Sequence, residues 1–239
     1  MAMQPFGPAE KMQEAAGKLI QYFDEQARPL VFTGLEKGFA DVLACYPAAA
    51  FTIESDRDNF DYVYLAEHLI SLSGRKLHSK KNHLNAFHKA NPQAQYLPIT
   101  ADIIPACRAE LESWYALRIQ DEPDDPFIGW ERKAIMEIFD DYSYFGLQGG
   151  AILLDGRIIA FTFGEQLNEN TAVVHVEKAD PNIRGAYPAI NQAYVSSCWQ
   201  DMMYINREED MGHDGLRKAK ESYKPEKLIE KFNAQLIES

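Results

Sequence analysis

The stretch from residue 147 to residue 194 constrains the fold of this chain more than any other. Two apolar runs, 151–154 and 158–164, are joined by Asp155-Gly156, a dipeptide that favours a two-residue type I′ turn. A third run, 171–177, follows turn residues and has the character of a strand. After a break comes a helical pattern with a face of small residues, namely Ala186, Ala189, Ile190, Ala193 and Ser197. The sequence therefore predicts an antiparallel three-stranded meander followed by a helix that packs closely on the sheet.

The composition is that of a globular protein. Of the 239 residues, 46% are hydrophobic and 12% aromatic, so the chain can bury a real core in one domain or two. No apolar run is long enough to span a bilayer and the chain shows no signal-peptide pattern, so we expect a cytoplasmic protein without a transmembrane segment. The cysteines Cys45, Cys107 and Cys198 are widely spaced and odd in number, which favours reduced thiols and offers no metal-ligand spacing. A net charge of −12 argues against extended nucleic-acid binding and leaves room only for a local basic patch.

One window breaks the acidic character of the chain. Between Glu67 and Asp102 there is neither aspartate nor glutamate. A helix over 75–90 would bury Leu77, Leu84 and Phe87. This helix has two interpretations, a solvated basic face or a surface that meets an anion such as phosphate, nucleic acid or an anionic head group. The candidate anion contacts are His78, Lys80, Lys81, Asn82 and Asn85.

The order of predicted elements indicates a known type of fold. The first part reads as helix 8–26, strand 29–33, helix 35–45 and strands 50–54 and 62–65. From residue 96 the order is strand, two helices, meander, helix, strand 204–206, helix 216–223 and a segment, 228–232, that is ambiguous between helix and strand. This second order resembles the GNAT acyltransferase fold, and the first part resembles the second half of the same fold. We therefore expect an α/β (α+β) chain of tandem GNAT-like mixed sheets flanked by helices, with an incomplete first copy. The expected domains are a partial N-terminal half over 1–92, including the basic connecting helix, and a C-terminal domain over 93–239.

Short motifs along the chain also resemble one family. They are HSKKNHLNAF at 78–87, TAVVHVEKA at 171–179, YPAINQ at 187–192, NREED at 206–210 and GLRKAK at 215–220. Together they resemble a bacterial domain family of unknown function that is related to the C-terminal synthase domain of phosphatidylglycerol lysyltransferases. The resemblance covers roughly residues 5–232, and family members begin with additional N-terminal sequence. It implies a GNAT-like fold and an acyl- or aminoacyl-transfer ancestry.

Transfer chemistry needs a group that removes a proton from the attacking amine or hydroxyl. By the two-residue period of a strand, His175 and Glu177 would share one face, with Glu177 near the end of the strand. Glu177 is the favoured general base, a role typically worth about 10²–10⁴-fold in rate, and His175 is its neighbour. The alternative is a structural pair at the edge of a sheet, in which His175 and Glu177 hydrogen-bond to each other and have no catalytic role. Tyr223 lies where the GNAT resemblance places a proton donor, although a packing role is the simpler interpretation.

The donor site is predicted at the turn before the helix that begins near residue 186. GNAT enzymes hold the coenzyme A pyrophosphate on backbone N–H groups at such a helix N-terminus. This turn keeps Arg184 and Gly185, but it has Tyr187 where a small residue is usual, and Pro188 removes one N–H donor. The acyl-CoA signal is therefore weak, and an aminoacyl-tRNA donor suits the turn better. The candidate donor contacts are Arg184, Gly185, Tyr187, Asn191, Arg217, Lys218 and Lys220.

The charged run 207–210 has two interpretations. Its three acids could hold a hard cation, but the adjacent Arg207 favours an internal ion-pair network at the surface, so no metal site is expected. The resulting hypothesis is a cytoplasmic acyl- or aminoacyl-transferase. The alternatives are a non-catalytic module that binds an anionic ligand or partner on the same fold, and an inactive fragment.

Overall fold

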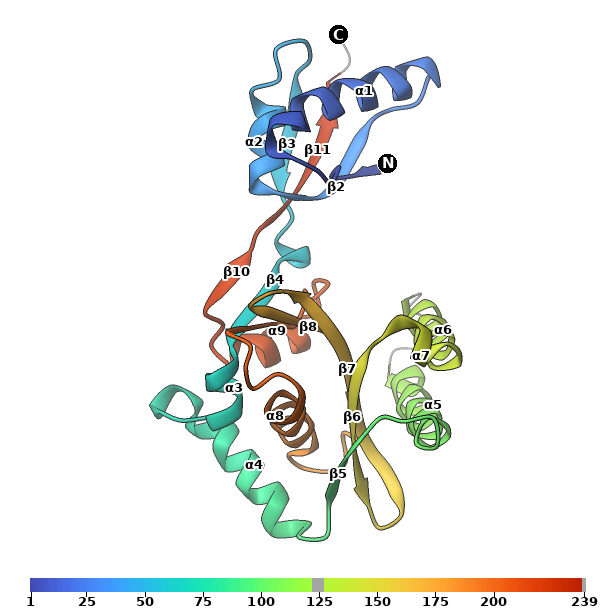
Figure 1. Ribbon diagram of the computed structural model, residues 1–239, viewed down its shortest axis with the longest axis vertical. Coiled ribbons are helices and arrows are strands. Elements are labelled where there is room, and N and C mark those ends of the chain that lie inside the picture. The colour runs from blue at the N-terminus through green and yellow to red at the C-terminus, as the bar shows by residue number, and fades with distance from the viewer. Residues whose placement is uncertain (122–126, 238–239) are drawn as a thin grey trace. The chain divides into compact units, whose positions relative to one another are not determined.

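The computed structural model describes residues 1–121 and 127–237 (Figure 1). The chain divides into two compact units, and it passes from one to the other more than once, so each unit consists of separate segments. The first unit contains Met1–Tyr62, Glu208–Lys220 and Lys227–Ser239. The second contains Val63–Arg207 and Glu221–Glu226. This division differs from a single boundary near residue 92, because the last strand of the chain returns to the first sheet and the basic helix belongs to the second unit.

The first unit is built on a mixed four-stranded sheet in the order β1-β2-β11-β3. β1 (Ala2–Met3) runs parallel to β2 (Val31–Glu36), and β11 (Lys231–Leu236) runs antiparallel to both β2 and β3 (Phe51–Ser55). The helices α1 (Met12–Glu25) and α2 (Lys37–Ala44) contribute Ala16, Phe39 and Leu43 to its buried core. The remaining elements here are the short 3₁₀ helices η1 (Ala9–Lys11) and η2 (Arg57–Asn59), the strand β10 (Lys227–Ile229) and most of α9 (Asp214–Glu221).

The second unit contains the predicted meander. β6 (Gln148–Leu154), β7 (Arg157–Asn168) and β8 (Thr171–Ala179) pair antiparallel, and β5 (Gln95–Pro98) joins the free side of β6. On the other side, β9 (Tyr204–Asn206) runs parallel to β8 and pairs antiparallel with β4 (Asp61–Leu65). The turn between β6 and β7 has positive φ at Asp155 (50°) and Gly156 (78°), as a type I′ turn requires. The meander prediction is therefore confirmed.

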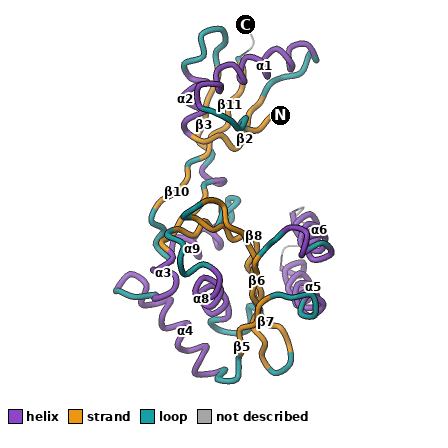
Figure 2. Tube along the Cα trace, viewed as in Figure 1, coloured by secondary structure: helices purple, strands orange, loops and turns teal. Residues whose placement is uncertain are grey.

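Helices cover both faces of this sheet (Figures 1 and 2). One face carries α5 (Ile104–Asp121), α6 (Phe127–Asp140) and α7 (Tyr142–Phe145). Leu111, Phe139 and Phe163 belong to the core that they enclose. The other face carries α8 (Ala186–Cys198), against which α3 (Ala66–Ser71), the 3₁₀ helix η3 (Arg75–Leu77) and α4 (His78–Ala90) gather. Within the described residues, no helix has both the length and the apolar character that crossing a membrane requires.

The expected fold class is confirmed as α/β, with two mixed sheets flanked by helices. The basic helix forms, and Leu77, Leu84 and Phe87 are buried as predicted. The ambiguous segment 228–232 is extended rather than helical. The sequence analysis did not anticipate α3, whose six residues are too few to show a periodic pattern.

A β-bulge in β8 positions the residues at the centre of the unit. Val174 pairs with Gly164 and Val176 pairs with Phe163, so His175 is one extra residue on β8 at the point where the register shifts. A bulge interrupts the strict alternation of side chains between the two faces of a strand. His175 and Val176 consequently both lie on the side of α6, whereas Glu177 lies on the side of α8.

Candidate functional site

Glu177 is held on the α8 side of the sheet by two hydrogen bonds. Its Oε2 accepts a hydrogen bond from Asn191 Nδ2 of α8 at 2.8 Å. Its Oε1 accepts one from Arg207 Nη2, also at 2.8 Å, and Arg207 directly follows β9. The side chains of Glu177 and Arg207 are only 11% and 12% exposed. The parallel strands β8 and β9 therefore bring a carboxylate and a guanidinium together in a nearly dry environment.

Aromatic rings and a second cation complete this arrangement. The Arg207 guanidinium lies 4.8 Å from the ring centroid of Tyr223 and 5.6 Å from that of Tyr64. The Lys80 amino group of α4 lies 4.3 Å from the same Tyr223 centroid. We call these residues the Glu177 cluster: Glu177, Asn191, Arg207, Lys80, Tyr223 and Tyr64. They come from β4, α4, β8 and α8 and from the segments that follow β9 and α9, all within the second unit.

Burial sets the proton affinities in the cluster. Burial, reinforced by the positive charge of Arg207, lowers the pKa of Lys80 to about 8, and Glu177 opposes this shift only in part. Burial also raises the pKa of Tyr223, against the effect of Arg207. Burial by itself would lower the pKa of Arg207, but the neighbouring Glu177 carboxylate raises it above its ordinary value. At neutral pH the cluster therefore holds a protonated phenol, a charged guanidinium and an amine that titrates nearby.

Asn191 is almost fully buried, at 1% exposure. Its Nδ2 donates to Glu177, while its Oδ1 has no hydrogen-bond partner among the described residues. An amide oriented in this way fixes the carboxylate and presents one unsatisfied acceptor beside it. Asn191, predicted as a donor contact, thus lies directly against the predicted base.

His175 does not belong to the cluster, which corrects the prediction that it shares a face with Glu177. Its Nε2 lies 3.1 Å from Glu165 Oε1. It lines a hollow of about 430 Å³ on the opposite face of the sheet, together with Ile135 of α6 and Phe145 of α7. The bulge at His175 is the physical reason, because it reverses the side on which the residues after it emerge.

The turn before α8 is covered by α4. Gly185 has φ +86°, and a Cβ there would lie 2.5 Å from the backbone oxygen of His83. The chain therefore needs glycine at this position both for its backbone conformation and for the approach of α4. Arg184 is exposed. Tyr187 accepts a hydrogen bond from Trp114 Nε1 at 3.0 Å, which directs it toward α5.

Arg217, Lys218 and Lys220, the remaining predicted donor contacts, belong to the first compact unit. Arg217 binds Asp210 through two hydrogen bonds of 2.9 and 2.8 Å. Lys220 donates to the carbonyl of Glu208 at 3.1 Å, and Lys218 is exposed. Arg217 and Lys220 therefore bind residues within the segment 208–220.

The charged run 207–210 is not a surface network. Asp210 is fully buried and also accepts a hydrogen bond from Tyr62 Oη at 2.6 Å. Burial acts to raise the pKa of Asp210, but Arg217 and Tyr62 outweigh it and hold that pKa well below its usual range. Arg207 is paired with Glu177, 30 residues away. The internal surface pairing expected for this run is thus wrong, because β9 places Arg207 next to β8.

The candidate anion contacts on α4 separate into two groups. His78, Asn82 and Asn85 are exposed. Lys81 donates to the carbonyl of Ser71 at 3.0 Å, and Lys80 turns toward the Glu177 cluster. The helix therefore presents a polar surface on one side and contributes one amine to the interior on the other.

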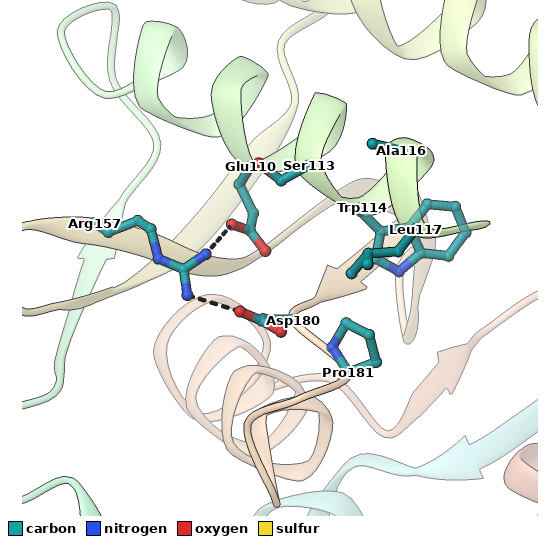
Figure 3. A pocket seen from close by; sticks show the side chains of 8 residues that line it. All are labelled: Glu110, Ser113, Trp114, Ala116, Leu117, Arg157, Asp180 and Pro181. Atoms are coloured by element: carbon teal, nitrogen blue, oxygen red, sulfur yellow. Dashed lines mark hydrogen bonds and ion pairs between the residues drawn. The ribbon is translucent and has the colours of Figure 1, made fainter. Parts of the chain in front are cut away.

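A second hollow, of about 240 Å³, lies between α5 and the end of β8 (Figure 3). Arg157 bridges two carboxylates there, at 3.1 Å to Glu110 and 2.7 Å to Asp180. Burial, reinforced by Asp180, raises the pKa of Glu110 to about 7, and Arg157 opposes the shift. The sequence offered no signal for this group, since its members are far apart in the chain and follow no common period.

The comparison with known families covers almost the whole chain. A family model described as "Phosphatidylglycerol lysyltransferase, C-terminal" matches residues 1–235. The chain belongs to this family. The predicted resemblance is therefore confirmed, and it extends through both compact units.

Two solved structures are similar to this chain in fold, and one further relative is similar in sequence. A conserved protein of unknown function from Bacteroides thetaiotaomicron is 37% identical, with a TM-score of 0.88 over 98% of this chain and 78% of that one. The structure of L-PGS from Bacillus licheniformis has 12% identity and a TM-score of 0.68 over 98% of this chain and 76% of that one, a likeness in fold alone. An uncharacterized protein of Mycoplasmoides gallisepticum is 27% identical over 180 residues, or 74% of this chain. The match spans 56% of that relative's length.

Proposed function

We propose that this chain transfers an acyl or aminoacyl group to an amine or hydroxyl acceptor, and that the Glu177 cluster is the reacting centre. Membership of the lysyltransferase C-terminal family supports the reaction class. The observation that carries the proposal is the carboxylate of Glu177, which is oriented by Asn191 and Arg207 and lies in one buried cluster with the amine of Lys80 and the phenol of Tyr223.

The cluster contains the groups that acyl transfer needs. As the acceptor attacks the carbonyl carbon, it must lose a proton, and the leaving group must gain one. Glu177 is the proposed proton acceptor, and Asn191 and Arg207 are the proposed positioning residues. Tyr223, whose pKa is raised by burial, is protonated at neutral pH, and its hydroxyl is the proposed proton donor to the leaving group.

The donor that fits this chain best is an aminoacyl ester, such as aminoacyl-tRNA. A coenzyme A donor would require open backbone N–H groups at the start of α8 for its pyrophosphate. Here the His83 carbonyl and Phe87 of α4 lie against Gly185 in that turn. A reactive ester at the end of an RNA acceptor stem needs no pyrophosphate cradle. We accordingly rank acyl-CoA below aminoacyl-tRNA as a donor.

A specific observation also favours the alternative of a binding module. Both oxygens of the Glu177 carboxylate already accept hydrogen bonds, from Asn191 and from Arg207, which leaves less of the carboxylate open to an acceptor molecule. A module of this kind would hold an anionic ligand at Lys80 and Arg207 without turning it over. The two functions differ in whether a bound donor is consumed.

The test combines binding with donor consumption. The purified protein is titrated with acetyl-coenzyme A, coenzyme A and an RNA acceptor-stem mimic while its melting temperature is followed, since a ligand that binds only the folded state raises it. Labelled aminoacyl-tRNA is then incubated with the protein and small amine or hydroxyl acceptors. We expect an RNA response and release of the label above the protein-free rate. Binding without release would favour the module, and a response to coenzyme A alone would reverse the ranking of donors.

A further inference from the structure

Lys80 stands out among the lysines of the second unit by its surroundings. Its amino group faces the ring of Tyr223 at 4.3 Å and is partly withdrawn from solvent. Over the parts of the chain that the structure describes, Lys80 Nζ forms no hydrogen bond or ion pair. By contrast, the next residue, Lys81, donates to the carbonyl of Ser71, and Lys178 donates to Glu131 at 2.7 Å.

The Arg207 guanidinium acts against the protonated form of Lys80. The Arg207 guanidinium faces the same Tyr223 ring, so two cations share one aromatic side chain. The Glu177 carboxylate, which favours the protonated form of Lys80, is already bound by Arg207 and Asn191. A lysine that is desolvated and placed next to another cation is a recognised form of activated amine nucleophile.

We propose that Lys80 is a modification site, at which the amine reacts with activated acyl esters and thioesters and becomes N-acylated. The neutral nitrogen adds to the carbonyl carbon, a C–N bond forms, and the C–O or C–S bond to the leaving group breaks. The proton released by nitrogen goes to the leaving group, which departs as an alcohol or a thiol. The product is an amide, so the modification is stable.

Acylation changes the electrostatics of the Glu177 cluster. The amide carries no charge, so one of the two cations beside the carboxylate is lost. The consequence for activity rests on the proposed function: if the cluster is the reacting centre, acylation of Lys80 lowers the rate of transfer. The reactivity of Lys80 itself does not depend on that function, because it requires only the amine and an electrophile.

The experiment measures labelling of each lysine by the acetyl ester of N-hydroxysuccinimide between pH 6 and pH 10, using the full chain and peptide mass spectrometry. A lysine model peptide in the same tube supplies an ordinary amine, with a pKa of about 10.4. At pH 7.5 the neutral fraction of Lys80 is about 200-fold larger than that of the model peptide, as follows from the two pKa values. We expect Lys80 to label at least tenfold faster than the peptide, with a midpoint near pH 8.

Two pairs of variants, one at Lys80 and Lys81 and one at Arg207, identify the cause. Lys80→Arg should remove the fast-labelling site, while Lys81→Arg, the matched control on α4, should leave it. Arg207→Gln removes the second cation and should raise the pH midpoint of Lys80 labelling. Arg207→Lys retains the charge, so its midpoint should lie below that of Arg207→Gln. Labelling of Lys80 no faster than the model peptide in the folded wild-type protein, or no labelling at all up to pH 9, would overturn the proposal. Fast labelling together with unchanged donor consumption would leave Lys80 as a modification site and count against the proposed reacting centre instead.

Discussion

Glu177 and Arg207 form an ion pair of 2.8 Å between Oε1 and Nη2 that is almost withdrawn from water, with side chains 11% and 12% exposed. Glu177 lies on β8 and Arg207 directly follows its parallel neighbour β9, so the pair depends on the register between the two strands. Breaking a buried pair by removing one partner leaves the other charge uncompensated, which is far more costly than losing the attraction itself. This pair therefore fixes the geometry of the cluster.

Replacement of Arg207 by Gln should lower the free energy of unfolding by about 3–5 kcal/mol, because the buried Glu177 side chain loses the guanidinium that is hydrogen-bonded to it. Urea denaturation measures the loss. The matched control is Arg132→Gln, whose pair with Glu112 has side chains 46% and 45% exposed. Exposed pairs contribute at most about 1 kcal/mol, so that variant should change little. Equal effects of the two substitutions would show that the Glu177–Arg207 pair is not buried in solution.

Replacement of Gly185 by Ala tests the contact between α4 and the turn before α8. The positive φ of this residue alone costs an L-residue about 1–2 kcal/mol, and the approach of the His83 oxygen adds to it. Gly129 of α6 has open space around it and no unusual φ, so Gly129→Ala should stabilise by about 0.5–1 kcal/mol. Thermal melts of both variants provide the comparison. Opposite signs are expected, and a neutral Gly185→Ala would mean that α4 does not cover the turn.

Glu110 should make the protein less stable as the pH rises toward neutrality. Its pKa is raised from the usual 4.5 to about 7 in the folded state, so the folded chain binds more protons than the unfolded chain between these values. The contribution of Glu110 to the free energy of unfolding is fully present below pH 4.5. It falls by about 3 kcal/mol in total as the pH rises to 7. Glu110→Gln should flatten this part of the stability profile. The exposed Glu137→Gln serves as the control, and an unchanged slope in Glu110→Gln would refute the assignment.

Asp210 should have the opposite pH dependence. Its carboxylate is fully buried, and hydrogen bonds from Tyr62 and Arg217 keep its pKa below the ordinary value. The stability that it supplies is therefore present above about pH 4 and is lost as the pH falls through the folded-state pKa. Asp210→Asn should cost about 3–5 kcal/mol at pH 7 and less in strong acid. Asp41→Asn, which changes an exposed carboxylate on α2, should have an effect below about 1 kcal/mol at either pH.

Local pattern predicted much of the second unit. The Asp155-Gly156 turn, the meander and the buried stripe of α4 depend on residues that are close in the chain, where turn chemistry and periodicity apply. The pairing of β11 with β2 and β3 could not be predicted in this way, because it joins residues about 200 positions apart. The residue pattern within a strand shows which positions alternate, but it does not identify a distant partner strand.

The candidate site shows the same limit. Glu177, Asn191, Tyr223 and Lys80 were each singled out from the sequence, and the structure brings them into one cluster. Arg207 was assigned to its acidic neighbours because its position beside Glu177 follows only from β9 pairing with β8. His175 was predicted on the wrong face because the prediction assumed a strict two-residue period along the strand. The extra residue of a β-bulge breaks that period, and the sequence does not reveal it.

The most direct test of the central claim compares Glu177→Gln with wild type in both donor binding and donor consumption. Glutamine preserves the shape of the side chain but cannot accept a proton as a carboxylate does. The control is Glu169→Gln, in the exposed turn between β7 and β8, and circular dichroism verifies that each variant is folded. We predict at least a 100-fold loss of aminoacyl-tRNA consumption in Glu177→Gln, with the shift in melting temperature caused by the acceptor-stem mimic retained. Consumption at the wild-type rate in a folded Glu177→Gln protein would contradict the account.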